Sequence, residues 1–497
     1  MTVARPVRPP RQRGDYGRSA IGFVAAIAAA EAAAMLSLAA LVSIGDDQRT
    51  TIGFAVMAVA AAVPARIGLA RFRVPSQTLA TRVLAMVTVN WALLAGISAV
   101  AHIVAGATTN VSVAIFEGTA AVTTTAMTTL DPDEIGRGLH LYRAMAQWLG
   151  GLGAIILGIV VLPLALGSGE SSARFAVRSG RRSLLAGRAT GFERVIAIYG
   201  GFTTLLVVAF ALAGTSGFEA LVHGLTVAST GGLSTSTTSV AGLGAGAEWV
   251  AAIGMALAGV SIAAAWWAVI GDLGALVRST ELRAYVLAIA ATTAVIALDG
   301  GTVRGAFALA GSAASTTGAV GSTTTDSLGP GAATLLFFVA GIGAMAGSAG
   351  GGFGWIRLLH AVGFARRELV QQLHPDAVRV VKVGGRAVSE ASLSRTNGYI
   401  AMFTMTAGLG ALLVALGDTD IGVSSSISLS VAALSTSGLQ TIAPVDVATI
   451  DDGSLLALAA LMLLGRLAIS AAVLTLATGL RRSALAARRR VAADAPW

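Results

Sequence analysis

Long apolar stretches are the feature of this sequence that most restricts the folds open to it. A helix needs about 20 mainly apolar residues to cross a hydrocarbon core about 30 Å thick. Ten stretches of this kind lie at residues 20–44, 52–65, 83–106, 143–166, 195–214, 248–271, 283–299, 333–347, 398–417 and 454–479. The second and the eighth are short or interrupted by glycine. We therefore predict an all-α membrane protein with about ten spans.

The composition agrees with a chain that folds in lipid. Of the 497 residues, 55% are hydrophobic and 12% are charged, and the mean hydropathy is +0.78. A water-soluble domain carries roughly 25% charged residues. Half of that proportion leaves too little polar surface to cover a water-soluble globule.

The sequence lacks the motifs of the common enzyme classes. It contains no cysteine, which excludes disulfides and thiolate metal sites, and its five histidines have no metal-ligand spacing. We find no nucleophile elbow, Walker loop or HExxH zinc motif. The run GGLGAI at 150–155 precedes an apolar helix without a strand before it, so it indicates close helix packing rather than a dinucleotide loop. We predict that the chain is not an enzyme and needs no cofactor.

Basic and acidic gaps alternate along the chain, and this alternation predicts the orientation. Cytoplasmic loops of membrane proteins carry an excess of Arg and Lys. The basic gaps are the N-terminus, 66–82, 172–194, 357–395 and the tail from 481. The acidic gaps, predicted to face outward, carry Asp131, Asp133, Glu134, Asp326, Asp418, Asp420, Asp446, Asp451 and Asp452. We predict a protein of the plasma (cytoplasmic) membrane with both termini cytoplasmic. The net charge of +9 is dispersed among loops, so nucleic acid is not a predicted partner.

Four outward-facing gaps contain a similar string of Ser, Thr and Gly. The strings are TTTAM at 123–127, STGGL at 229–233, STTGA at 315–319 and STSGL at 435–439, here called filter loops 1 to 4. Each follows a short apolar segment that cannot cross a bilayer, as expected of a re-entrant half-helix. This internal repeat predicts two N-terminal helices followed by four helix–re-entrant loop–helix units around one pore.

The residue types of the filter loops suit the binding of a dehydrated cation. Such an ion needs a ring of oxygen ligands, which backbone carbonyls can supply. Glycine adopts the required backbone conformations readily, and Ser or Thr hydroxyls can add ligands. Non-helical backbone at membrane depth is tolerated where it lines a water-filled cavity. The half-helices also direct their partially negative ends inward. Ordinary exterior turns would not explain the fourfold recurrence.

Together these residues resemble the Trk/Ktr/HKT superfamily of cation transporters, and in particular its TrkH branch. FEGTAAVTTTAMTTLDP and the following LYRAMAQWLGGLGAIILGIVVLPL resemble the family's first filter and helix. GAMAGSAGGGFGWIRLLH at 343–360 resembles its gating segment, and RRELVQQLHPDAVRVVKVGGRAVSE at 366–390 its cytoplasmic stretch. LMLLGRLAI at 461–469 resembles its last helix. The likeness covers about residues 79–482, and two extra N-terminal spans favour the TrkH branch.

The resemblance implies potassium uptake and gives roles to individual residues. It implies an intramembrane gating loop at Gly350, Gly351 and Gly352, with Arg466 facing the same cavity. An Arg at membrane depth is costly and therefore functional by default, although its side chain can also extend to an interface. The implied ion-binding residues of the filter, which would hold potassium, are Thr124, Thr125, Ala126, Thr230, Gly231, Gly232, Thr316, Thr317, Gly318, Thr436, Ser437 and Gly438.

The resemblance also implies partners and a division of the chain. It implies a homodimer in the lipid membrane, and a cytosolic nucleotide-binding ring that docks on the basic loops at 172–194 and 357–395. The predicted units are the N-terminus with two extra helices (1–78), pore repeat 1 (79–190), pore repeat 2 (191–282), pore repeat 3 with the gating loop (283–396), and pore repeat 4 with the basic tail (397–497).

Two departures from the family pattern leave alternatives open. Ala126 stands where potassium-selective relatives usually have Gly, and plant relatives with Ser there tend to favour sodium. Either the first loop relaxes, which we favour, or sodium also permeates. Ala468 stands where relatives often carry an acid near Arg466. A secondary carrier and a subunit of an ATP-driven pump are the other classes considered. Neither inverted repeats nor a buried mid-span acid supports the carrier, and the stretch at 366–390 argues against the pump subunit.

Overall fold

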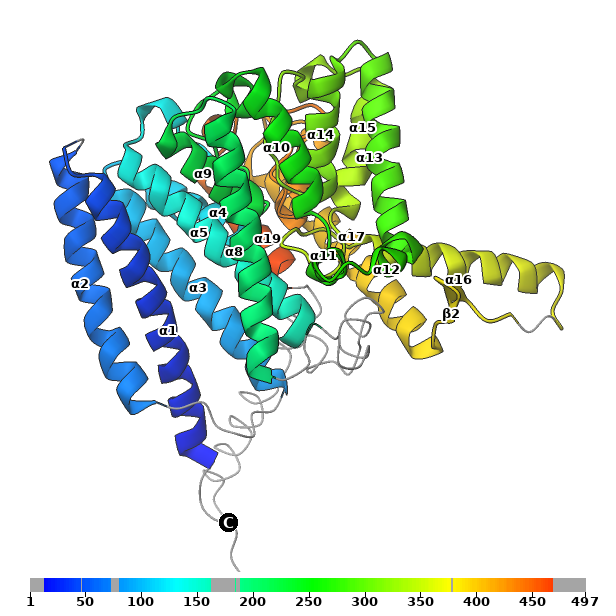
Figure 1. The fold of residues 1–497 in the computed structure, drawn as a ribbon, viewed down its shortest axis with the longest axis horizontal. Helices are drawn as coiled ribbons and strands as arrows, with labels where there is room; N and C mark the ends of the chain where they lie inside the picture. Colours follow the sequence, from blue (N-terminus) through cyan, green and yellow to red (C-terminus); the bar gives the residue numbers. More distant parts are fainter. Residues whose placement is uncertain are drawn as a thin grey trace, which may run out of the picture.

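The computed structural model describes residues 13–45, 47–72, 80–161, 184, 188–376 and 379–467. Their regular secondary structure is almost entirely helical, which confirms the predicted all-α class (Figure 1). Within them, one small antiparallel hairpin joins β1 (Lys382–Val383) to β2 (Arg386–Ala387). Most of the basic loop at 172–194, residue Ala468, the end of the predicted last span and the basic tail lie outside the described residues.

The two N-terminal helices pack along each other at one side of the bundle (Figure 1). They are α1 (Arg13–Val42) and α2 (Gln48–Arg71). The Asp47 side chain caps α2, and a hydrogen bond from the Thr50 hydroxyl lowers the pKa of this carboxyl below its ordinary value. The predicted span 52–65 was too short, because α2 continues through Pro64 to Arg71.

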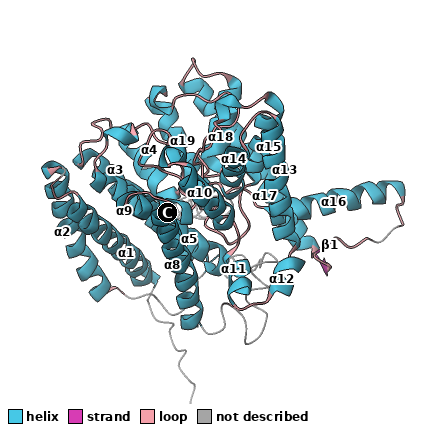
Figure 2. Cartoon of the chain, turned by 45° about the horizontal axis from the view of Figure 1, so that its top comes forward, coloured by secondary structure: helices cyan, strands magenta, loops and turns pink. Residues whose placement is uncertain are grey.

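Four units of one design follow these helices (Figure 2). The long first helices are α3 (Ala80–Val104), α8 (Arg188–Leu212), α13 (Thr280–Leu298) and α17 (Glu390–Gly417). The short second helices, here called pore helices, are α4 (Val111–Thr123), α9 (Gly217–Ala228), α14 (Val303–Ser315) and α18 (Val423–Leu434). The returning helices are α5 (Arg137–Ile156), α10 (Ala245–Ala258), α15 (Pro330–Ile342) and α19 (Asp452–Arg466). Filter loops follow the pore helices, as predicted.

Short helical turns connect the filter loops to the returning helices. These turns are Pro132–Glu134, Ser239–Leu243, Thr325–Ser327 and Val447–Thr449. A π-helical segment, Leu157–Val161, continues α5. The pore helices have 12 or 13 residues and are about 20 Å long, shorter than the bilayer core. Each therefore enters the membrane and ends inside it.

Among the described residues, six helices are long and apolar enough to cross a membrane. They are α1, α2, α3, α8, α13 and α17. The predicted span over 248–271 is broken, because α10 and α11 (Ile262–Val269) meet at an angle of 104°. The break frees backbone groups for distant partners: Met345 N–H donates to the Gly259 carbonyl, and Ile262 N–H donates to the Gly347 carbonyl, both at 3.0 Å. The predicted span 333–347 also stops early, at Ile342, where Gly343 has a φ of 73°.

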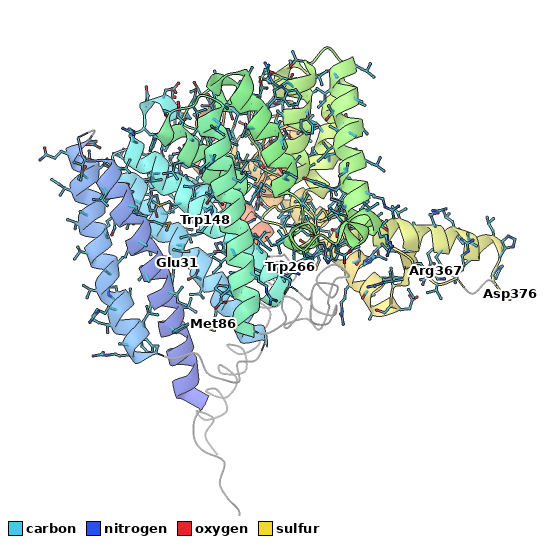
Figure 3. All side chains as sticks on the ribbon, in the orientation of Figure 1. Glu31, Met86, Trp148, Trp266, Arg367 and Asp376 are labelled. Atoms are coloured by element: carbon cyan, nitrogen blue, oxygen red, sulfur yellow. The ribbon has the colours of Figure 1, made fainter. Side chains whose placement is uncertain are left out.

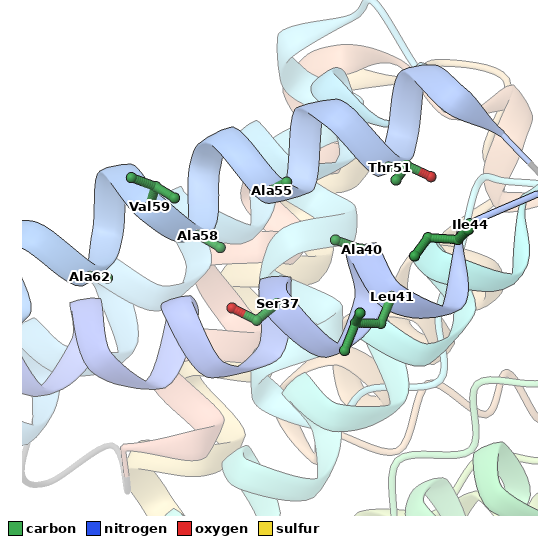
Figure 4. Close-up of a pocket in the computed structure, with 9 residues that line it drawn as sticks. All are labelled: Ser37, Ala40, Leu41, Ile44, Thr51, Ala55, Ala58, Val59 and Ala62. Atoms are coloured by element: carbon green, nitrogen blue, oxygen red, sulfur yellow. The ribbon is translucent and has the colours of Figure 1, made fainter.

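The apolar outer surface agrees with a protein surrounded by lipid. Large apolar side chains on the long helices, such as Leu287, Leu298 and Met405, are well exposed. A shallow apolar groove runs between α1 and α2, lined by Ser37, Ala40, Leu41, Ile44, Thr51, Ala55, Ala58, Val59 and Ala62 (Figure 4). Helix α16 (Trp355–Leu373) projects from the bundle and carries Arg367, which pairs with Glu390 and Glu368 (Figure 3). A short helix, α12 (Leu273–Arg278), precedes α13.

Candidate functional site

All four pore helices end in the same hydrogen-bonded turn. The third residue of each filter loop donates its N–H to the carbonyl five residues earlier, which is the 6→1 bond of a Schellman motif. The four bonds are Thr125 to Ala120 at 2.9 Å, Gly231 to Thr226 at 2.7 Å, Thr317 to Ser312 at 2.9 Å, and Ser437 to Ala432 at 3.0 Å. The sequence repeat is therefore a repeat of backbone geometry.

The second residue of each loop is a threonine in the left-handed conformation. The φ angles are 57° at Thr124, 55° at Thr230, 60° at Thr316 and 55° at Thr436. They are four of the six non-glycine residues with positive φ in the described parts of the chain. A left-handed backbone costs a residue with a Cβ atom about 1–2 kcal/mol, and glycine usually takes this place. Strain of this kind concentrates at functional sites, so four strained threonines mark the loops as the candidate site.

Loop 1 differs from the other three loops in the backbone conformation of its fourth residue. Gly232, Gly318 and Gly438 have φ angles of 71°, 78° and 71°, whereas the φ angle of Ala126 lies outside the left-handed region. In loops 2 to 4 the sign of φ therefore alternates over the second, third and fourth residues, which turns consecutive carbonyls toward one side. Because Ala126 does not adopt the left-handed conformation, its methyl group avoids the left-handed strain.

The four loops meet in chain order and form a closed arrangement. A methyl group added at Gly232 would overlap the Thr317 carbonyl oxygen of loop 3, and one at Gly318 would overlap the Ser437 carbonyl oxygen of loop 4. One at Gly438 would lie 2.6 Å from the Ala126 backbone nitrogen of loop 1. The second and third residues of all loops are buried, while the fourth residues are partly exposed. The arrangement thus has a buried base and an open mouth.

We expect Gly318→Ala to lower cation flux into liposomes by about tenfold or more. The left-handed backbone alone costs alanine about 1–2 kcal/mol, and the new methyl would also overlap the Ser437 carbonyl oxygen. Gly200→Ala is the matched control, because Gly200 on α8 has open space at its Cβ position. Equal flux in the two variants would contradict the close packing of the loops.

The threonine hydroxyls at the buried base of the filter loops differ in whether they have a hydrogen-bond partner. The Thr124 and Thr436 hydroxyls are buried without a hydrogen-bond partner among the described residues. The Thr230 hydroxyl donates to the Ser229 carbonyl at 2.6 Å, and the Thr316 hydroxyl accepts the Gly351 N–H at 2.8 Å. A buried hydroxyl without a partner is costly. The oxygen atoms of these two hydroxyls are therefore candidates to coordinate a ligand.

The glycine-rich segment between α15 and α16 lies directly below the filter loops. Besides its bond to Thr316, Gly351 packs against Thr436, where an added methyl would overlap the hydroxyl oxygen. A methyl at Gly350 would lie 3.0 Å from the Thr316 hydroxyl oxygen. The φ angle of Gly352 is 83°, a conformation that suits glycine. The structure thus brings the predicted gating glycines against the loops of units 3 and 4.

Arg466 connects this glycine segment to the rest of the bundle. One guanidinium nitrogen donates to the Ala349 carbonyl at 2.8 Å, and the other terminal nitrogen donates to the Gly150 carbonyl of α5 at 2.9 Å. The side chain is only 5% exposed. Arg466 therefore crosses the space beneath the filter loops and does not extend to the membrane surface.

Two buried acidic residues at the filter loops were not predicted from the sequence. Glu117 of α4 pairs with Arg143 of α5 at 3.1 Å and accepts the Thr129 N–H at 2.5 Å, so it fixes the chain just after loop 1. Glu248 of α10 accepts the Ser322 N–H at 2.6 Å just after loop 3 and also binds Arg304. The sequence feature that could have identified these two residues is an acidic side chain within an apolar segment.

Polar side chains of the pore helices hold the chain after loops 2 and 4 in a similar way. His223 of α9 lies 3.2 Å from the Thr235 hydroxyl. The Ser428 hydroxyl of α18 accepts the Thr441 N–H at 3.1 Å and the Ile442 N–H at 3.2 Å. Each filter loop is therefore held on both sides, by the Schellman turn before it and by a buried polar side chain after it.

Comparison with known proteins shows which proteins this chain is similar to. The model of the TrkH family, described as a cation transport protein, matches residues 48–263. The chain is 26% identical to the Trk system potassium uptake protein TrkI of Halomonas elongata, over 88% of this chain and 92% of that protein. It is 29% identical to the Trk system potassium uptake protein TrkH of Salmonella typhimurium, over 69% of this chain and 74% of that protein.

A solved structure shows the same fold. The crystal structure of the potassium transporter TrkH from Vibrio parahaemolyticus superposes with a TM-score of 0.81 at 24% identity, and covers 92% of this chain and 97% of that chain. The fold, the fourfold set of filter loops and the two long-range sequence matches agree with one another. The chain is therefore similar to the TrkH family of cation transport proteins over most of its length.

Proposed function

We propose that this protein takes up potassium into the cell through the four filter loops. The observation that carries the proposal is the left-handed threonine at the second place of each loop, found at four equivalent positions. Such strain is retained where it serves a function, and here it arranges oxygen atoms around one axis. The relatives named above are potassium uptake proteins, which supports the choice of ion.

In this proposal the carbonyl and hydroxyl oxygens of the filter loops replace the hydration shell of the ion. The partially negative ends of four pore helices make the site attractive to a cation. The ligands come from the second, third and fourth residues of each loop: Thr124, Thr125, Ala126, Thr230, Gly231, Gly232, Thr316, Thr317, Gly318, Thr436, Ser437 and Gly438. The alternating φ signs in loops 2 to 4 support carbonyl coordination.

The proposed gate is the glycine segment at 350–352 together with Arg466. The Gly351 N–H donates a hydrogen bond to the Thr316 hydroxyl oxygen at the base of the filter. In this state that hydroxyl already has a partner within the glycine segment. Arg466 also places a positive charge beneath it, which opposes a cation that leaves the filter. In the proposed mechanism, potassium passes when this segment moves away from Thr316.

Sodium permeation through the same loops is the second candidate function. The observation in its favour is Ala126, which departs from the backbone geometry of the three glycines. The carbonyl group of Ala126 is then oriented differently from those of the three glycines at the open mouth of the filter loops. A secondary carrier, the candidate of another class, receives no specific support from the geometry of the described residues.

The proposal extends to assembly and orientation. We propose a homodimer in the cytoplasmic membrane, with both termini cytoplasmic and five parts divided at residues 78, 190, 282 and 396. A cytosolic nucleotide-binding ring would dock on the basic segments at 172–194 and 357–395, and the projecting α16 and its hairpin are part of the second of these. The alternation of basic and acidic gaps supports the orientation.

Ion flux in liposomes that contain only the purified protein tests the proposal. We expect potassium flux to exceed sodium flux severalfold when the two gradients are compared side by side. If sodium flux equals or exceeds potassium flux, the second candidate is correct, and Ala126→Gly is the variant expected to restore the preference for potassium. Continued absence of flux in the presence of a regulatory partner would contradict an ion pathway.

A further inference from the structure

Gln147 of α5 is a buried polar side chain at a filter loop that the proposed function leaves unexplained. Its side-chain nitrogen donates to the Gly231 carbonyl of loop 2 at 2.8 Å. The side chain is fully buried, and its Oε1 atom has no hydrogen-bond partner among the described residues. Burying an amide with only part of its hydrogen bonds satisfied costs free energy. A specific role for this residue would account for that cost.

The repeated architecture identifies the residue that corresponds to Gln147 in the second unit. Gly151 of α5 and Gly259 at the end of α10 make matching contacts. An added methyl at Gly151 would lie 3.0 Å from the Ser229 Cα atom, and one at Gly259 would lie 2.9 Å from the Ser315 Cα atom. Gln147 precedes Gly151 by four residues, and Met255 precedes Gly259 by the same spacing.

Tyrosine contacts support this correspondence. The Tyr199 hydroxyl donates to the Trp148 carbonyl at 3.0 Å, and the Tyr285 hydroxyl donates to the Ala256 carbonyl at 2.9 Å. These carbonyls directly follow Gln147 and Met255 in the chain.

The fourth unit also places a methionine there. Gly465 packs on the Leu434 carbonyl in the same way as Gly150 packs on the Val122 carbonyl. Met462 lies three residues before Gly465, and Gln147 lies three residues before Gly150. Both Met462 and Met255 are fully buried. Units 2 and 4 thus fill this place with an apolar side chain of similar size, so packing alone does not call for glutamine.

The junction between loops 1 and 2 is where glutamine makes a difference. At the next two junctions, the fourth-residue glycines Gly232 and Gly318 pack directly on third-residue carbonyls of the following loop. The corresponding pair at the first junction is Ala126 and Gly231. Ala126 does not take the left-handed conformation, and the Gly231 carbonyl accepts the amide of Gln147. The Gln147 hydrogen bond is therefore found at the junction that lacks the glycine.

We propose that Gln147 is a positioning residue of the filter, which fixes the Gly231 carbonyl at this junction and thereby sets the preference for potassium over sodium. This inference rests on the proposed cation function. A carbonyl held by a buried amide keeps its place when a smaller ion enters. Without the amide, the carbonyl can move inward and coordinate sodium, so discrimination between the ions weakens.

The test is rubidium binding to the purified full-length protein in detergent, with displacement by potassium and by sodium. Equilibrium binding does not require the gate to open. We expect Gln147→Met to lower the ratio of potassium to sodium affinity by about fivefold, the size expected for one hydrogen bond. The methionine preserves the side-chain volume and matches the residue found at the corresponding place in units 2 and 4. If Gln147→Met does not fold, Gln147→Leu is used in its place. Met255→Leu is the control and should leave the ratio unchanged.

A second measurement tests the link to Ala126. In an Ala126→Gly background, loop 1 can pack on the Gly231 carbonyl as its neighbours do, so Gln147→Met should change the ratio less than it does in the natural chain. An unchanged ratio in Gln147→Met, with normal rubidium binding by the unaltered protein, would overturn this inference and leave the proposed function intact. An unaltered protein that binds neither rubidium nor potassium would overturn both.

Discussion

Replacing Arg466 with glutamine is expected to raise cation flux without a regulatory partner by about tenfold or more. The substitution weakens or removes the contacts to the Ala349 and Gly150 carbonyls. Hydrogen bonds from a charged group contribute about 1.5–3 kcal/mol each, and 1.4 kcal/mol corresponds to a tenfold change in an equilibrium. Because these contacts hold the glycine segment beneath the filter loops, we expect their loss to shift the segment away from the position in which we propose that it blocks the pathway. The measurement is potassium flux into liposomes.

Two control variants separate this effect from a general change of charge. Arg466→Lys keeps the charge but cannot reproduce the two-pronged geometry, so its flux should lie between those of the natural protein and Arg466→Gln. Arg367→Gln removes a positive charge from the projecting α16, and its flux should equal that of the natural protein. Removal of a buried charge also removes its desolvation cost, so stability should change little. Unchanged flux in Arg466→Gln would show that the gate has other determinants.

The filter loops could be predicted from the sequence because their signals are local. A short apolar segment followed by Thr and Gly reports the length of a pore helix and the conformation of the turn that ends it. Both properties depend on residues within one loop. Repetition made the signal strong, since one such string would have been ambiguous. Arg466 was visible for a similar reason: it is a charged residue within an apolar run.

Long-range partners set the features that the sequence did not predict. The bend between α10 and α11 depends on hydrogen bonds to Met345 and Gly347, more than 80 residues away along the chain. Glu117 was visible as an acid in an apolar segment, but nothing in its spacing identifies Arg143 as its partner. Gln147 illustrates the same limit. Its place on an apolar helix suggests packing, and only the folded arrangement brings it to the Gly231 carbonyl.

The Glu117–Arg143 pair gives the second large prediction, which concerns stability. Both side chains are almost fully buried, at 0% and 2% exposure. Removing one partner of a buried pair leaves the other charge uncompensated and costs about 3–5 kcal/mol. We expect Glu117→Gln to destabilise the protein by about this amount, measured as loss of folded protein on heating in detergent. The Thr129 N–H also loses a charged acceptor, so the preference for potassium should fall.

The chain supplies a matched control in Glu248, which binds a filter segment in the same way. Its partner Arg304 is 32% exposed, so water can solvate the arginine when Glu248→Gln removes the opposite charge. Glu248→Gln should therefore cost clearly less stability than Glu117→Gln. Replacing both members of the buried pair, as Glu117→Leu with Arg143→Met, should recover most of the lost stability. It should not recover the preference for potassium, because the chain after loop 1 still lacks its acceptor. Equal losses in Glu117→Gln and Glu248→Gln would show that burial does not set the strength of these contacts.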